Sequence, residues 1–185
     1  MKKFTPYFIV QTAICTLVPC IVLGIIGQKV AGAILSGGPN AATTIAYPYT
    51  LVLHTLYAVI FAVSAIITQK SLSKKRLEVP EKPMAAYAIA AGVLLAVSIV
   101  FSIIGLQTNV DQVVMQRLST DQIFTLLSQY AAKNITITDQ QEILAKFVAD
   151  IQNSFKISTI IAKVIQAVIA AGTVVFLNKK HSELF

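Results

Sequence analysis

The chain has 185 residues, of which 56% are hydrophobic and 12% are charged, and its formal net charge is +7. A soluble domain carries about a quarter charged residues, so the composition argues against a soluble domain and for an integral membrane protein. In a soluble protein the positive charge would favour nucleic-acid binding. Here we assign it to lysine-rich segments beside membrane spans, and we expect no nucleic-acid partner.

The first apolar stretch covers residues 4–26 and follows two lysines. A cleaved signal peptide is the alternative, because Ala31-Gly32-Ala33 has the small-x-small form of a cleavage site. The stretch is about twice as long as the apolar region of a signal peptide, and it contains Gln11 and Pro19. We therefore expect an uncleaved membrane helix.

Two further spans are predicted at residues 48–69 and 85–106. Residues 36–40 are rich in glycine and turn-forming residues, which predicts a loop before the second span. Pro48 is expected near the first turn of that span, where proline is tolerated. The short segment that joins the two spans carries five basic residues, which are Lys70, Lys74, Lys75, Arg76 and Lys82.

One long helix is predicted from Thr138 to Leu177. Its first half is amphipathic, with apolar residues at three- and four-residue spacing. Its second half is apolar nearly all round, and we predict a fourth span at residues 157–177, since about 20 apolar residues cross a bilayer. Residues 107–156 then form a helical segment between the third and fourth spans.

Together these elements predict an all-α integral membrane protein, a four-helix bundle that forms a single membrane domain over residues 1–185. Lysine and arginine concentrate in the N-terminal residues, the segment between spans two and three, and the C-terminal residues. The positive-inside rule therefore places both termini in the cytoplasm and residues 107–156 outside it, as a cap of amphipathic helices. We expect a multi-pass protein of the cell (plasma or inner) membrane.

One apolar face stands out in the predicted cap. It consists of Ile123, Leu126, Leu127 and Tyr130, and Ser119 or Thr120 can cap the helix that carries it. We favour a cap whose helices cover one another's apolar faces. The alternative is that this face stays open and binds a partner helix.

Small residues at four-residue spacing form possible packing ridges on three spans. The ridge of the third span consists of Ala88, Gly92 and Ala96. Small residues let helix backbones approach closely in lipid, where hydrophobicity provides no net attraction between helices. We favour packing within the chain, and contact with a second protomer is the alternative. The other ridges are Ala58 with Ala62 and Ala167 with Ala171.

Polar residues inside the predicted spans are the main candidates for a site. Lys163 lies inside the fourth span, where a lysine at the helix centre would cost about 2.5–3.5 kcal/mol. We favour a lysine that extends to the nearer membrane surface. The alternative is a polar cavity that Lys163 shares with His54 and Gln166, and such a cavity would serve transport or ligand binding.

Signatures of an enzyme, a cofactor or a metal site are missing from the sequence. The predicted spans contain no acidic residue, and His54 is the one histidine within them. Cys15 and Cys20 are too far apart for a Cys-x-x-Cys motif. We therefore expect a non-catalytic protein without cofactors that acts through protein–protein interaction.

The predicted layout resembles two kinds of membrane protein in outline, and no motif supports either resemblance. Tetraspanins also have four spans with a large outer part between the third and fourth, but the outer segment here contains no cysteine. Immunity proteins against pore-forming bacteriocins share the size and layout. The expected partners are the lipid bilayer and another membrane protein or a second copy. The expected role is that of an accessory, assembly or protective subunit, and a small transporter or channel component is the alternative.

Overall fold

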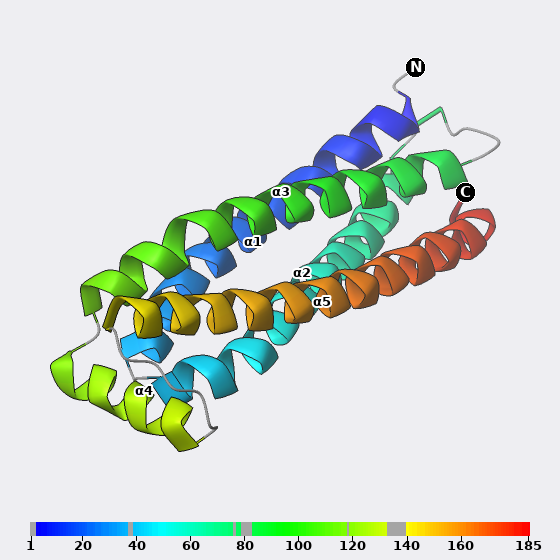
Figure 1. Cartoon of the computed structure of the whole chain (residues 1–185). Coiled ribbons are helices and arrows are strands. Elements are labelled where there is room, and N and C mark those ends of the chain that lie inside the picture. Colours follow the sequence, from blue (N-terminus) through cyan, green and yellow to red (C-terminus); the bar gives the residue numbers. More distant parts are fainter. Residues whose placement is uncertain (1–2, 37–38, 76, 79–82, 118, 133–139) are drawn as a thin grey trace. The chain divides into compact units, whose positions relative to one another are not determined.

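The structure is a computed structural model in which every described element is a helix. It describes the backbone of residues 3–36, 39–75, 77–78, 83–117, 119–132 and 140–185. Side chains are not described at some of these positions, chiefly at 34–36, 39–47 and 101–117. The helices, in chain order (Figure 1), are α1 Phe4–Ser36, α2 Pro39–Ser73, α3 Met84–Arg117, α4 Thr120–Ala132 and α5 Gln140–Leu184.

The helices extend beyond the predicted spans. Because α2 begins at Pro39, Pro48 lies inside the helix and not in its first turn, contrary to our expectation. The proline at the start of α2 is Pro39. Proline suits the first position of a helix, because the N–H group that it lacks would have no partner there. The long helix predicted up to Leu177 is confirmed as α5, which continues to Leu184. The capping residue predicted at Thr138 lies outside the described residues.

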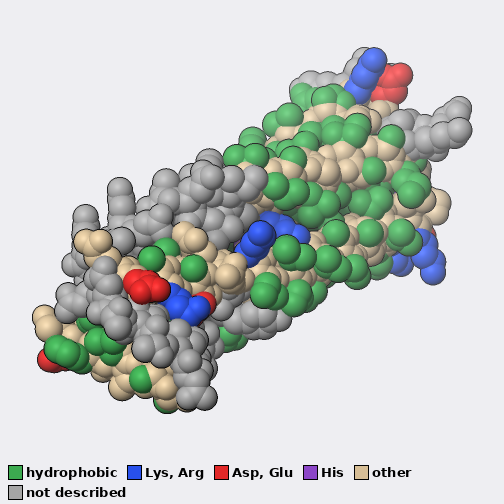
Figure 2. Space-filling model, in the orientation of Figure 1, with side chains coloured by type: hydrophobic (Ala, Val, Ile, Leu, Met, Phe, Trp, Pro, Cys, Tyr) green, Lys and Arg blue, Asp and Glu red, His purple; other side chains and the backbone are tan. Residues whose placement is uncertain are grey.

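Among the described residues, three helical segments are long and apolar enough to cross a membrane. They are Phe4–Gly27, Leu51–Ser73 and Lys156–Leu184. The apolar part of α3 is described as Met84–Val100, which is shorter than a span, so a crossing at residues 85–106 stays a prediction. Large apolar side chains are exposed along these helices, as lipid contact requires. Figure 2 shows hydrophobic side chains over much of the described surface on one face.

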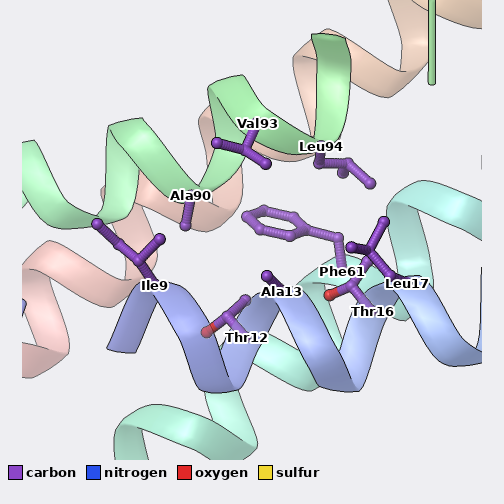
Figure 3. Close-up of a pocket in the computed structure, with 9 residues that line it drawn as sticks. All are labelled: Ile9, Thr12, Ala13, Thr16, Leu17, Phe61, Ala90, Val93 and Leu94. Atoms are coloured by element: carbon purple, nitrogen blue, oxygen red, sulfur yellow. The ribbon is translucent and has the colours of Figure 1, made fainter. Parts of the chain in front are cut away.

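The chain divides into two compact units. The first unit comprises Met1–Gly24, Leu53–Val100 and Ala162–Phe185, and the second comprises Ile25–Val52 and Phe101–Ile161. The core of the first unit draws on α1, α2, α3 and α5, with Phe8, Phe61, Tyr87 and Leu177 among its buried residues. Figure 3 shows the Phe61 ring of α2 between side chains of α1 and α3.

One end of the first unit is closed by aromatic residues. The ring of Phe4 lies 5.6 Å from that of Phe8, 5.5 Å from that of His181 and 5.3 Å from that of Phe185, centroid to centroid. The Phe4 amide donates a hydrogen bond to the Glu78 carbonyl, with an N–O distance of 3.0 Å. These contacts bring the two ends of the chain and the segment after α2 to the same end of the unit. The side of the membrane that this end faces stays a prediction.

In the second unit, α4 packs against the first half of α5. Leu126 and Tyr130 of α4 are buried, as are Ile143 and Phe147 of α5. The Tyr130 hydroxyl donates a hydrogen bond of 2.8 Å to the Asp150 carboxylate, which joins the two helices. Amphipathic helices of this kind cover each other's apolar faces.

Candidate functional site

Lys163 is the centre of a polar cluster in the first unit. Its ammonium group donates a hydrogen bond of 2.9 Å to the carbonyl oxygen of Ser98 on α3, and another to the Ser98 hydroxyl. It lies 3.3 Å from Nδ1 of His54 on α2 and 3.4 Å from Oε1 of Gln166, three residues later on α5. Three helices therefore supply polar groups to one lysine.

The groups around Lys163 are well buried, whereas Lys163 itself is partly exposed. Gln166 is 0% exposed, Ser98 5% and His54 7%. The Ser98 hydroxyl donates to Gln166 Oε1 at 2.9 Å, so serine links the lysine and the glutamine. His54 Nδ1 accepts from the lysine in the ring tautomer that carries its proton on Nε2. Of these four residues, Lys163 is therefore the one that reaches the surface of the first unit.

The cluster holds a positive charge and an unused donor. Among the described residues, the Nε2 atom of Gln166 is buried without a hydrogen-bond partner. The groups that contact Lys163 are neutral acceptors, and none of the predicted spans contains Asp or Glu. Buried charges in proteins are normally paired, and buried donors are normally satisfied. This cluster therefore has the composition of a site for a negatively charged or hydrogen-bond-accepting group.

The alternative prediction grouped His54, Lys163 and Gln166 in one polar cavity, and in the structure Lys163 contacts both of the other residues. Sequence analysis did not single out Ser98, which makes the shortest contacts with Lys163. Serine is common in membrane helices, and its position relative to Lys163 depends on how α3 packs against α5. The weak signal available was that Ser98 is a polar residue within an apolar segment. A role of the cluster in ligand binding or transport stays a prediction.

The small-residue ridge of α3 faces outward in the described structure. Ala88, Gly92 and Ala96 are all exposed, and a Cβ atom added at Gly92 would meet no described heavy atom within 4 Å. The buried side of α3 consists of other residues, with Tyr87 and Leu94 among them. The expected packing of this ridge within the chain is therefore not observed, and contact with a partner stays a prediction.

The predicted partner-binding face of α4 is largely covered within the second unit. Leu126 is 1% exposed and Tyr130 6%, whereas Ile123 and Leu127 are partly exposed. The large apolar residue that α4 does expose is Phe124, at 60%. Burial raises the pKa of Tyr130, and the hydrogen bond to Asp150 and the negative charge of that carboxylate raise it further. Binding of a partner through this face stays a prediction.

A second polar network in the first unit was not found by sequence analysis. Gln69 of α2 donates through Nε2 to the Tyr87 hydroxyl at 2.7 Å and to the Leu177 carbonyl at 2.8 Å. The Tyr87 hydroxyl also lies 2.7 Å from Nδ1 of His181. The hydrogen-bonded pairs lie 18, 94 and 108 residues apart in the chain, so no local spacing reveals them.

A small cavity lies between α1, α2 and α3 in the first unit (Figure 3). Its volume is about 20 Å³, which is enough for about one water molecule. Thr12 and Thr16 line it together with apolar side chains, and both hydroxyls are buried without a hydrogen-bond partner among the described residues. The cavity is too small for an organic ligand.

Metal binding finds no support in the part of the chain that the structure describes, where no three His, Cys, Asp or Glu residues come together. The polar cluster holds hydrogen-bond donors on Lys163, Ser98 and Gln166. In comparisons with known families, curated proteins and solved structures, no family model, protein or structure matched this chain.

Proposed function

We propose that this chain is a non-catalytic, multi-pass membrane protein that acts by binding another membrane protein or a second copy of itself. Its role would be that of an accessory, assembly or protective subunit. The observation that carries the proposal is the outward-facing ridge of Ala88, Gly92 and Ala96 on α3, with open space beside Gly92.

The ridge of α3 differs from the exposed face of α1 in the size of its side chains. Exposed positions on α1 carry bulky branched side chains, such as Val10, Ile14 and Val18. Lipid tails accommodate such side chains, so they need no protein partner. A ridge of small residues instead lets a second helix approach to backbone contact, where van der Waals packing and weak hydrogen bonds favour association. This contrast supports α3 as the contact helix.

The second unit offers a further contact outside the predicted spans. Phe124 is exposed on α4, whereas Leu126 and Tyr130 are covered by the chain itself. An exposed phenylalanine is a suitable anchor for an interface, because aromatic residues dominate interface energetics. We propose that a partner would first meet this side of α4 and not the buried face.

The proposal is tested by adding bulk to the ridge. Gly92→Ile places a branched side chain where a partner helix would approach, and we expect about a tenfold or greater loss of the partner recovered with the tagged chain from native membranes. Gly172→Ile is the control for added bulk on another helix, because Gly172 of α5 is equally open; a partner that is lost only with Gly92→Ile identifies α3 as the contact helix.

The readout is mass spectrometry of proteins that copurify with each tagged variant, combined with the mass of the purified complex in mild detergent. A partner or a second copy that is lost with Gly92→Ile and kept with Gly172→Ile supports the proposal. Recovery of the wild-type chain as a monomer without a stoichiometric partner would overturn it.

A second candidate function is that of a small transporter or channel component. The observation that favours it is the cluster of Lys163, His54, Ser98 and Gln166, since ionisable groups inside membrane helices commonly mark ion or substrate pathways. Currents across planar bilayers in sodium chloride would test this function. Transport is favoured over interaction if Lys163→Leu and His54→Leu abolish the currents while both variants still bind the partner.

A further inference from the structure

We infer that the cluster around Lys163 is a binding site for a single monovalent anionic group. The group is held by the Lys163 ammonium and the Gln166 carboxamide, and it comes from a free small anion or from a phospholipid phosphodiester. This anion site does not depend on the interaction function proposed above. It deepens the second candidate function, transport, because it names the class of ligand that the Lys163 cluster would bind.

Lys163 brings a positive charge into a segment that is apolar enough to cross a membrane, and the groups that contact it are neutral. The predicted spans supply no carboxylate that could neutralise it. A charge in a membrane environment is strongly favoured by an opposite charge nearby, because the low dielectric constant strengthens their attraction.

An ammonium group has three N–H donors. Two of them serve the carbonyl and the hydroxyl of Ser98. For the third N–H group, the nearest acceptors lie 3.3 Å (His54) and 3.4 Å (Gln166) from the lysine nitrogen. Both distances exceed the usual range of up to about 3.2 Å. One donor of Lys163 is therefore held weakly and can turn to a ligand.

The carboxamide nitrogen of Gln166 is fully buried and lacks a partner among the described residues, although its oxygen accepts from Ser98. An unsatisfied buried donor costs about 1–3 kcal/mol. This nitrogen is bonded to the same carbon as Oε1, which lies 3.4 Å from the Lys163 nitrogen. An anion beside Lys163 would accept hydrogen bonds from both residues.

Lys163 is partly exposed, whereas His54, Ser98 and Gln166 are buried. An anion can therefore reach the ammonium from the surface of the first unit. Such a single-lysine site suits one negative charge, since the contacting groups provide no second cation.

The test for a free anion is the line width of the ³⁵Cl NMR signal of sodium chloride in the presence of the delipidated full chain in detergent. Binding broadens this signal, and added nitrate should reverse the broadening. Lys163→Met should reduce it to the level of detergent alone, and Gln166→Leu should weaken chloride binding about tenfold. Lys180→Met is the matched control, because it removes a lysine that pairs with Glu183 at the surface.

A further variant keeps the test decisive if Lys163→Met does not fold. Gln166→Glu has nearly the same shape as the wild type and provides an internal carboxylate beside Lys163, so it should abolish chloride broadening while the helical circular dichroism is kept. Wild-type broadening in folded Gln166→Glu would overturn the inference.

The test for a lipid source uses vesicles that contain equal amounts of phosphatidylcholine and phosphatidylglycerol, followed by extraction and native mass spectrometry of retained phospholipid. The phosphodiester is the ligand if the wild type and Lys180→Met retain phospholipid, Lys163→Met does not, and the wild type shows no chloride broadening. Chloride broadening that depends on Lys163 would identify a free anion. If neither signal depends on Lys163, the inference is wrong.

Discussion

Two buried glutamines in the first unit show how the same side chain can serve two purposes. Gln69 is 1% exposed and uses its Nε2 atom twice, toward Tyr87 and toward Leu177. Gln166 is 0% exposed, and its Nε2 atom has no partner among the described residues. Both lie in helices that are apolar enough to cross a membrane, so burial alone does not separate them.

The difference lies in what surrounds each amide. The carboxamide nitrogen of Gln69 joins α2 to α3 and α5, so its network has the character of a structural link. Gln166 shares its oxygen between Ser98 and Lys163 and leaves a donor unused beside a positive charge. A satisfied polar network contributes to stability, whereas a partly satisfied one is costly unless a ligand completes it. The comparison therefore predicts opposite responses to equivalent mutations.

The largest expected effect is the loss of stability in Gln69→Leu. This change removes two hydrogen bonds and leaves the Tyr87 hydroxyl with one partner fewer, so we expect the free energy of unfolding to fall by about 1–3 kcal/mol. Denaturation of the purified chain in mixed detergent micelles measures it. The matched change Gln166→Leu removes a donor that is already unsatisfied and should cost less. Equal losses in the two variants would remove the distinction drawn here.

A third polar contact, in the second unit, extends the comparison outside the predicted spans. Because the pKa of Tyr130 is raised in the folded chain, its stabilising effect is complete below the unfolded-state value of about 10 and is lost as the pH rises above it. We expect the wild type to lose stability relative to Tyr130→Phe as the pH increases from about 10. Parallel pH profiles of the unfolding free energy for the two proteins would contradict the raised pKa.

The smallest expected effect is that of Lys163→Leu on stability. The change removes contacts with neutral acceptors, but it also removes a charge that is unfavourable in lipid, and these effects oppose each other. We expect the unfolding free energy in chloride-free buffer to change by less than about 1 kcal/mol. A loss as large as that of Gln69→Leu would show that the Lys163 cluster is a structural link as well.

Sequence analysis predicted the helical character and the apolar segments because these depend on composition and on local spacing. Counting residues along the helices also grouped His54, Lys163 and Gln166 as candidates for one polar cavity, with Gln166 one turn from Lys163 on the same helix. Sequence analysis could not identify Ser98 as the main partner of Lys163, nor find the network of Gln69, Tyr87 and His181. Those contacts join residues far apart in the chain.

The rotation of α3 about its own axis could not be predicted from the sequence. The sequence contains a ridge of Ala88, Gly92 and Ala96, which we expected to pack inside, but the structure buries Tyr87, Leu94 and neighbouring residues instead. A helix that is apolar nearly all round has no polar face to mark its outside, so its pattern does not determine its rotation. Composition alone thus determined that this protein is helical and apolar enough for a membrane. Only tertiary packing decided which side of α3 is buried and which buried amide is left without a partner, because side-chain contacts between helices set both.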